Sequence, residues 1–158
     1  ILTRCVEFEL HKYSKADIKD YTDSLGINDQ LLIDISYSFD DVDRFRDFDL
    51  KYLNNLCRNI GESIGKATLP NTMIIPKKYL YFKEHEQGKF NLEVFVRMLQ
   101  YSLGNLFMSS NSQVVYYLYR EVVDFAGNLE NTSFSREMLV DNLLLNLWSI
   151  SRGGYSES

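Results

Sequence analysis

The chain has 158 residues, a length typical of one domain, and roughly two-thirds of the surface of such an unfolded chain can be buried on folding. Apolar residues make up 45% and charged residues 25%, with only 2 Pro and 8 Gly, which is a globular composition. The formal net charge of −5 argues against nucleic acid as a partner, because phosphate contacts need a clustered basic surface. We therefore expect a single domain over residues 1–158.

The cysteines and the hydropathy exclude several further classes. Cys5 and Cys57 lie far apart, and two thiols make neither a disulfide framework nor a zinc site. No apolar run reaches the length of about 18 residues that a membrane-spanning helix needs, and we expect no signal peptide before the domain. The start at Ile1 and the polar end over residues 151–158 indicate a piece of a longer protein. We expect a cytoplasmic domain that meets a membrane only through a tail outside this sequence.

The first third of the chain predicts helices separated by polar turns. Residues 1–12 fit an amphipathic helix, and a second, short helix lies between a Ser14 N-cap and a C-terminal cap at Gly26. Residues 30–38 fit either a helix or a strand, because the apolar run is short and contains β-branched residues. The acidic residues 40–44 are the best candidate for a loop.

The middle of the chain contains one amphipathic helix and an irregular region. From about residue 47 to residue 65 the apolar positions recur at helical spacing. Pro70 and Pro76 predict irregular or extended backbone over residues 68–76, and an aromatic segment follows at 79–82.

The last part of the chain predicts three helices. Asn91 is the expected N-cap of a helix over 92–108 that is apolar nearly all round, which indicates the centre of the fold. A turn at 110–112 leads into a second apolar helix, 114–125, which ends near Gly127, and a final helix runs from Ser133 or Ser135 to about Ile150. We expect an all-α bundle of six to eight helices around the apolar helical hairpin of residues 91–127.

No pattern in the chain predicts catalysis. The two histidines, His11 and His85, have no second His at the spacing of metal ligands. The letters Gly-Glu-Ser-Ile-Gly at 61–65 resemble a nucleophile elbow, but that elbow needs a preceding strand, and these glycines lie within a helical pattern. We therefore expect no enzyme, no metal and no cofactor.

The helix before residue 65 has an unusual arrangement of apolar, small and acidic residues. Gly61 and Gly65 each cost about 1 kcal/mol relative to Ala inside a helix, so we expect another backbone to approach closely. Apolar residues at one face, with a glycine and an acid after the third of them, give the pattern Leu53, Cys57, Ile60, Gly61, Glu62 and Ile64. This pattern resembles the third homology region of the Bcl-2 family of apoptosis regulators. Cys57 stands where the family has Leu, and Glu62 where it usually has Asp.

The order of the predicted elements is also similar to that family, over nearly the whole chain at low identity. The resemblance implies a Bcl-2-like fold in which an amphipathic first helix, a variable loop and the helix just described precede a central apolar helix. The family opens that helix with Asn-Trp-Gly-Arg, and its Arg pairs with the acid of a bound ligand helix. Asn91 to Val94 occupies this opening by cap position, and the alternative register matches Phe95-Val96-Arg97 to Trp-Gly-Arg.

The resemblance implies a hydrophobic groove for the amphipathic death-motif helices of pro-apoptotic proteins. Arg97, the only basic residue of the central helix, is our candidate partner of the ligand's acid. The candidate lining residues come from the three elements that would wall the groove, and they are Phe95, Val96, Leu99, Tyr79, Tyr81, Phe82, Ile60 and Ile64. For each of them, plain core packing is an equally good interpretation.

The sequence leaves two functional interpretations open. The first is a regulator of apoptosis that protects cell life and whose full-length form lies at the mitochondrial outer membrane. The second is an unrelated helical scaffold or adaptor that binds a partner through a flat interface.

Overall fold

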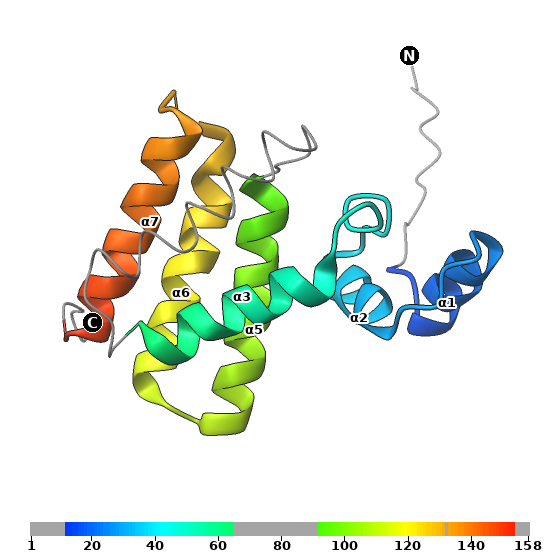
Figure 1. Ribbon diagram of the computed structural model, residues 1–158, viewed down its shortest axis with the longest axis horizontal. Helices are drawn as coiled ribbons and strands as arrows, with labels where there is room; N and C mark the ends of the chain where they lie inside the picture. The colour runs from blue at the N-terminus through cyan, green and yellow to red at the C-terminus, as the bar shows by residue number, and fades with distance from the viewer. Residues whose placement is uncertain (1–11, 65–91, 132, 154–158) are drawn as a thin grey trace, which may run out of the picture. The chain divides into compact units, whose positions relative to one another are not determined.

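The structure, a computed structural model, describes residues 12–64, 92–131 and 133–153. Every secondary-structure element in these ranges is helical, with six α-helices and one short 3-10 helix (Figure 1). The all-α prediction is confirmed for this part of the chain. The chain divides into two compact units, residues 1–47 and residues 48–158, which we describe one at a time. The prediction of one domain over 1–158 stays a prediction.

The first unit begins with α1, Lys15–Ser24, whose predicted caps are both present. The backbone N–H of Asp17 donates to Ser14 Oγ at 3.2 Å, and the N–H of Ser14 donates to the Asp17 carboxylate at 2.9 Å. This reciprocal pair is a capping box, with Asp in place of the usual Glu or Gln. The chain leaves the helix through Gly26 at φ 71°, a left-handed conformation that glycine adopts without steric cost.

The ambiguous apolar run becomes α2, Gln30–Phe39. Asp29 begins it, because its carboxylate accepts from the N–H of Leu31 at 2.9 Å. Asp40 ends it at φ 57°, and turns follow through residue 48, as predicted for the acidic segment. The helix expected at 1–12 lies outside the described residues except for Lys12.

The second unit begins with α3, Leu50–Ser63, which packs against α5. Asp49 caps α3 by accepting from the N–H of Tyr52 at 3.1 Å. The far end of α3 reaches the last turn of α7, where Ser151 Oγ donates to the carbonyl of Ile64 at 3.4 Å. The predicted irregular region 68–76 and aromatic segment 79–82 lie outside the described residues, as does Asn91.

Three longer helices complete this unit, and Figure 1 shows α5, α6 and α7 side by side with α3 running across them. They are α5, Leu92–Ser110; α6, Gln113–Asn128; and α7, Arg136–Ser151. The 3-10 helix Leu129–Asn131 extends α6, and Ser135 caps α7 by accepting from the N–H of Met138 at 3.3 Å. No described helix is both long enough and apolar enough to cross a bilayer.

Burial differs between the two helices of the predicted central hairpin. α5 buries side chains around much of its circumference, including Val94, Phe95, Val96, Met98 and Leu99. In contrast, the buried residues of α6 are confined to one stripe, Leu118, Val122 and Ala126, at steps of four. The fully buried surface is therefore wider on α5 than on α6, although α6 lies between α5 and α7 and packs against both (Figure 1).

Candidate functional site

The apolar positions of the α3 pattern lie on one buried face. Leu53, Cys57, Ile60 and Ile64 are all buried, as the steps of four, three and four between them predict. Leu50 and Leu56 are buried as well, each three residues from Leu53, so the buried stripe is wider than the sequence pattern indicated. The result is a helix attached to α5 by its apolar face.

Gly61 lies where α3 comes closest to α5. A Cβ atom built on Gly61 would lie 2.8 Å from Leu103 Cδ2 and 3.2 Å from Leu106 Cδ2. Real Cβ atoms essentially never have a neighbour under 3.0 Å, so a larger residue would displace Leu103. The close approach predicted for this glycine is present, although the neighbouring atoms belong to side chains and not to another backbone.

The acid of the pattern lies on the opposite, exposed face of α3. Glu62 Oε1 accepts from Arg58 Nε at 2.8 Å, one turn earlier in the same helix. Their side chains are 43% and 65% exposed, so solvent screens this pair and it contributes little to stability. Glu62 is therefore engaged by its own helix.

Cys57 has no reactive character. Its side chain is fully buried in the apolar face of α3, and this burial raises the pKa of the thiol well above its usual value. A thiol reacts as its thiolate, so Cys57 acts as a small apolar residue. Its place in the pattern is a packing position.

The candidate groove residues of α5 are mostly core. Phe95, Val96 and Leu99 are at most 1% exposed, whereas Arg97 is half-buried and its Nη1 donates to Gln100 Oε1 at 3.3 Å. Leu103, the neighbour of Gly61, lies six residues beyond Arg97, about 9 Å along the helix axis. The remaining candidates, Tyr79, Tyr81 and Phe82, lie outside the described residues.

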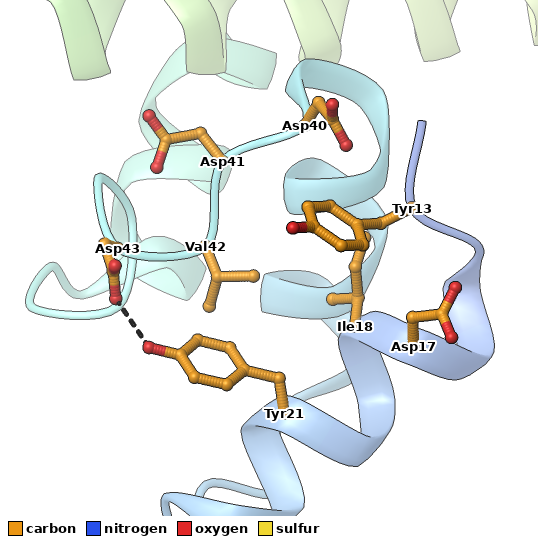
Figure 2. Close-up of a pocket in the computed structure, with 8 residues that line it drawn as sticks. All are labelled: Tyr13, Asp17, Ile18, Tyr21, Asp40, Asp41, Val42 and Asp43. Atoms are coloured by element: carbon orange, nitrogen blue, oxygen red, sulfur yellow. Dashed lines mark hydrogen bonds between the residues drawn. The ribbon is translucent and has the colours of Figure 1, made fainter. Parts of the chain in front are cut away.

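A separate pocket of about 370 Å³ lies within the first unit (Figure 2). The rings of Tyr13 and Tyr21 and the side chains of Ile18 and Val42 surround it in Figure 2. Four aspartates are also among its lining residues, Asp17, Asp40, Asp41 and Asp43, and the carboxylates of Asp17 and Asp41 point away from the rings in Figure 2. Sequence reasoning missed this pocket because its two sides, Tyr13 with α1 and the turn 40–43, are separated by the whole of α2.

Hydrogen bonds and ion pairs fix several of these carboxylates. Tyr21 OH donates to Asp43 Oδ1 at 3.1 Å, the dashed line in Figure 2. Arg44 lies 3.1 Å from Asp41, and Arg46 lies 3.4 Å from Asp43. The Ser14 hydroxyl and backbone N–H lower the pKa of Asp17.

Neither feature, as far as the structure describes it, is a metal centre. Across residues 12–64, 92–131 and 133–153, no three His, Cys, Asp or Glu side chains are gathered as a metal ion would need. The α3–α5 contact and the acidic pocket offer apolar surface, aromatic rings and fixed charge. Such groups recognise a ligand and need do no chemistry on it.

In comparisons with known proteins, no protein-family model, no curated protein and no solved structure matches this chain.

Proposed function

We propose that the chain is an apoptosis regulator of the Bcl-2 type, which binds amphipathic death-motif helices of pro-apoptotic partners in a hydrophobic groove and protects the cell. The observation that supports this proposal best is the seating of α3 on α5. Leu53, Cys57, Ile60 and Ile64 are buried there at the spacing of such a ligand helix, and Gly61 lies at the point of closest approach.

The second unit already accommodates one helix of this pattern, because α3 packs on α5 by its apolar face. Apolar anchors at positions i, i+4, i+7 and i+11 are what a helix-in-groove interface recognises. Each fully buried Leu or Ile contributes about 1.5–3 kcal/mol. A partner helix with the same anchors would gain a similar contribution from an adjoining part of the α5 surface.

Burial of the groove candidates sets a condition on binding. Phe95, Val96 and Leu99 are covered in the present conformation, so a ligand helix reaches them only after a rearrangement. Association that requires a conformational change is slower than the usual range of about 10⁵–10⁷ M⁻¹s⁻¹. We therefore expect slow association with a partner helix.

Arg97 is the proposed partner of the acid of the ligand. Its side chain is half-buried, so a carboxylate beside the guanidinium would be partly desolvated. Truncating one member of such a pair costs about 2–5 kcal/mol in binding.

Isothermal titration with a synthetic death-motif helix would test the proposal. The control peptide has its second apolar residue and its acid both replaced by Ala. We expect submicromolar binding of the first peptide, loss of binding in the control, and weaker binding to Arg97→Ala. Arg58→Ala is the matched variant, because Arg58 is an exposed Arg that already pairs with Glu62. The absence of binding heat from a folded sample at two temperatures would refute the proposed function. Equal affinity of the peptide for the unsubstituted protein and for Arg97→Ala would refute the proposed role of Arg97.

A specific observation favours the second candidate function, a scaffold with a flat interface. Phe134, Met138 and Leu145 are exposed, and the last two lie seven residues apart on α7. If the death-motif peptide does not bind, the scaffold function becomes the leading one. The double variant Met138→Gln and Leu145→Gln should then abolish association with a partner. We further propose that the protein, as an apoptosis regulator, acts at the mitochondrial outer membrane.

A further inference from the structure

The pocket of the first unit combines apolar, aromatic and acidic groups in a space of about 370 Å³. This volume is at the lower end of the roughly 300–1,000 Å³ typical of small-ligand pockets. Ile18 and Val42 supply apolar surface, and Tyr13 and Tyr21 supply aromatic rings that face the pocket in Figure 2. A purely polar ion would leave this apolar surface unused, so the ligand should carry both an aliphatic part and a charge.

The charge of the surroundings selects a cation. Residues 1–47 hold 11 of the 22 carboxylates of the chain but only 6 of its 17 Lys and Arg residues. They therefore carry the whole formal charge of −5, and residues 48–158 are neutral. Among the described residues that line the pocket, four are Asp and none is Lys or Arg.

The neighbouring arginines neutralise only part of this charge. Arg44 pairs with Asp41 and Arg46 pairs with Asp43, and the Asp17 carboxylate points away from the rings in Figure 2, which leaves the charge of Asp40 at the pocket. The Asp17 carboxylate accepts from both the hydroxyl and the N–H of Ser14, so its position is fixed. Asp40 is held at the end of α2 by its left-handed backbone. A fixed negative potential therefore remains at an apolar and aromatic pocket.

We infer that this pocket binds the side chain of an arginine in a basic segment of a partner protein. The guanidinium is planar, stacks on aromatic faces and donates two parallel hydrogen bonds to a carboxylate. Its three methylene groups would lie against Ile18 and Val42 while the charged end faces Tyr13 and Asp40, which lie at the same end of the pocket in Figure 2. Lysine is a poorer fit because its ammonium is a strongly hydrated point charge. This site is separate from the α3–α5 contact and does not depend on the function proposed there.

The test is an NMR titration of the full chain with the blocked peptide acetyl-Gly-Arg-Gly-amide. Citrulline in place of Arg gives a neutral peptide of nearly the same shape. We expect saturable shifts at Tyr13, Ile18 and Val42 with the Arg peptide, and at least tenfold weaker binding of the citrulline peptide. Equal binding of both peptides, or no saturable shift, would overturn the inference.

Two substitutions with the same change of charge separate the pocket from general attraction. Asp40→Asn keeps a residue that tolerates the left-handed backbone, and should weaken the Arg peptide at least fivefold. Asp23→Asn is the control, because Asp23 lies on α1 outside the pocket and pairs with Lys19 at 2.8 Å. If both variants lost the same affinity for the Arg peptide, the attraction would come from the overall negative charge of the protein, and the proposed site would be refuted.

A final pair of measurements separates a partner protein from a small guanidinium compound. Agmatine carries the same charged group without a peptide, and a longer Arg peptide extends the contact beyond the pocket. We expect the longer peptide to bind at least tenfold more tightly than agmatine. If agmatine bound as tightly as that peptide, the inference of a partner protein would be refuted, and the pocket would be a site for a small guanidinium compound.

Discussion

The tightest contact between α3 and α5 predicts an unusual response to a helix-favouring substitution. Gly61→Ala removes a helix penalty of about 1 kcal/mol. However, the new methyl group would lie 2.8 Å from Leu103 Cδ2, and Leu103 is only 1% exposed. Overpacking of a close-packed core costs about 1–3 kcal/mol. We expect the overpacking to exceed the helix gain, with a net loss of about 1 kcal/mol in the free energy of unfolding.

Two other helical glycines are matched controls. A Cβ on Gly104 would lie 3.5 Å from the ring of Tyr119, an ordinary contact, and a Cβ on Gly127 would have no heavy atom within 4 Å. Gly104→Ala should therefore keep its gain of about 1 kcal/mol, and Gly127→Ala, near the end of α6, should keep a smaller one. The expected difference between the Gly61 and Gly104 variants is about 2 kcal/mol.

Guanidinium chloride unfolding followed by far-UV circular dichroism would measure this difference, with the m-values compared to confirm a common transition. A second measurement places Gly61→Ala in a Leu103→Ala background, where the space left by Leu103 should make the added methyl group stabilising. If Gly61→Ala stabilises the native protein as much as Gly104→Ala does, the close approach is refuted. An unchanged effect in the Leu103→Ala background would show that another contact is responsible.

Three further predictions concern side chains in both units. Cys57 should resist a thiol reagent such as DTNB in a Cys5→Ser protein until denaturant is added, because burial raises the pKa of its thiol; rapid labelling of native protein would contradict this. Since Ser14 lowers the pKa of Asp17, the stabilisation from this pair is present above the ordinary pKa of 3.8 and is lost as pH falls through the lower folded pKa; Ser14→Ala should raise the Asp17 pKa in an NMR titration, and an unchanged pKa would exclude the capping contact. Leu143→Ala should cost about 2–5 kcal/mol in denaturant unfolding because Leu143 is fully buried, whereas Leu145→Ala, at 39% exposed, should cost clearly less; equal losses would place α7 in the wrong orientation.

The ends of the helices were the part of the fold most open to prediction from sequence. The sequence predicts caps or helix ends at Ser14, at Gly26 and at either Ser133 or Ser135, and in the structure Ser14, Gly26 and Ser135 have these roles. Capping depends on a few adjacent residues, so local sequence contains most of the information. Residues 30–38 were ambiguous for a related reason, because a short apolar run with β-branched residues suits either secondary structure and the decisive feature was the Asp29 cap.

Burial was harder to predict because it depends on the neighbours that a helix acquires. The apolar composition of residues 114–125 predicted a buried helix, yet Tyr116 is 40% exposed and α6 buries a single stripe. Gly61 was correctly assigned to a close approach, but the sequence could not reveal that Leu103 was the neighbour. The pocket was missed altogether, since the chain must reverse at Asp40 before Val42 can face Ile18.

The short connection between α5 and α6 has a consequence for the order of folding. Only Asn111 and Ser112 join these helices, whereas residues 64–91 separate α3 from α5. Closing the shorter loop costs less chain entropy, and contacts between neighbours in sequence form sooner. We expect the α5–α6 hairpin to form first and α3 to dock late. Substitutions at Gly61 should then change the rate of unfolding far more than the rate of folding.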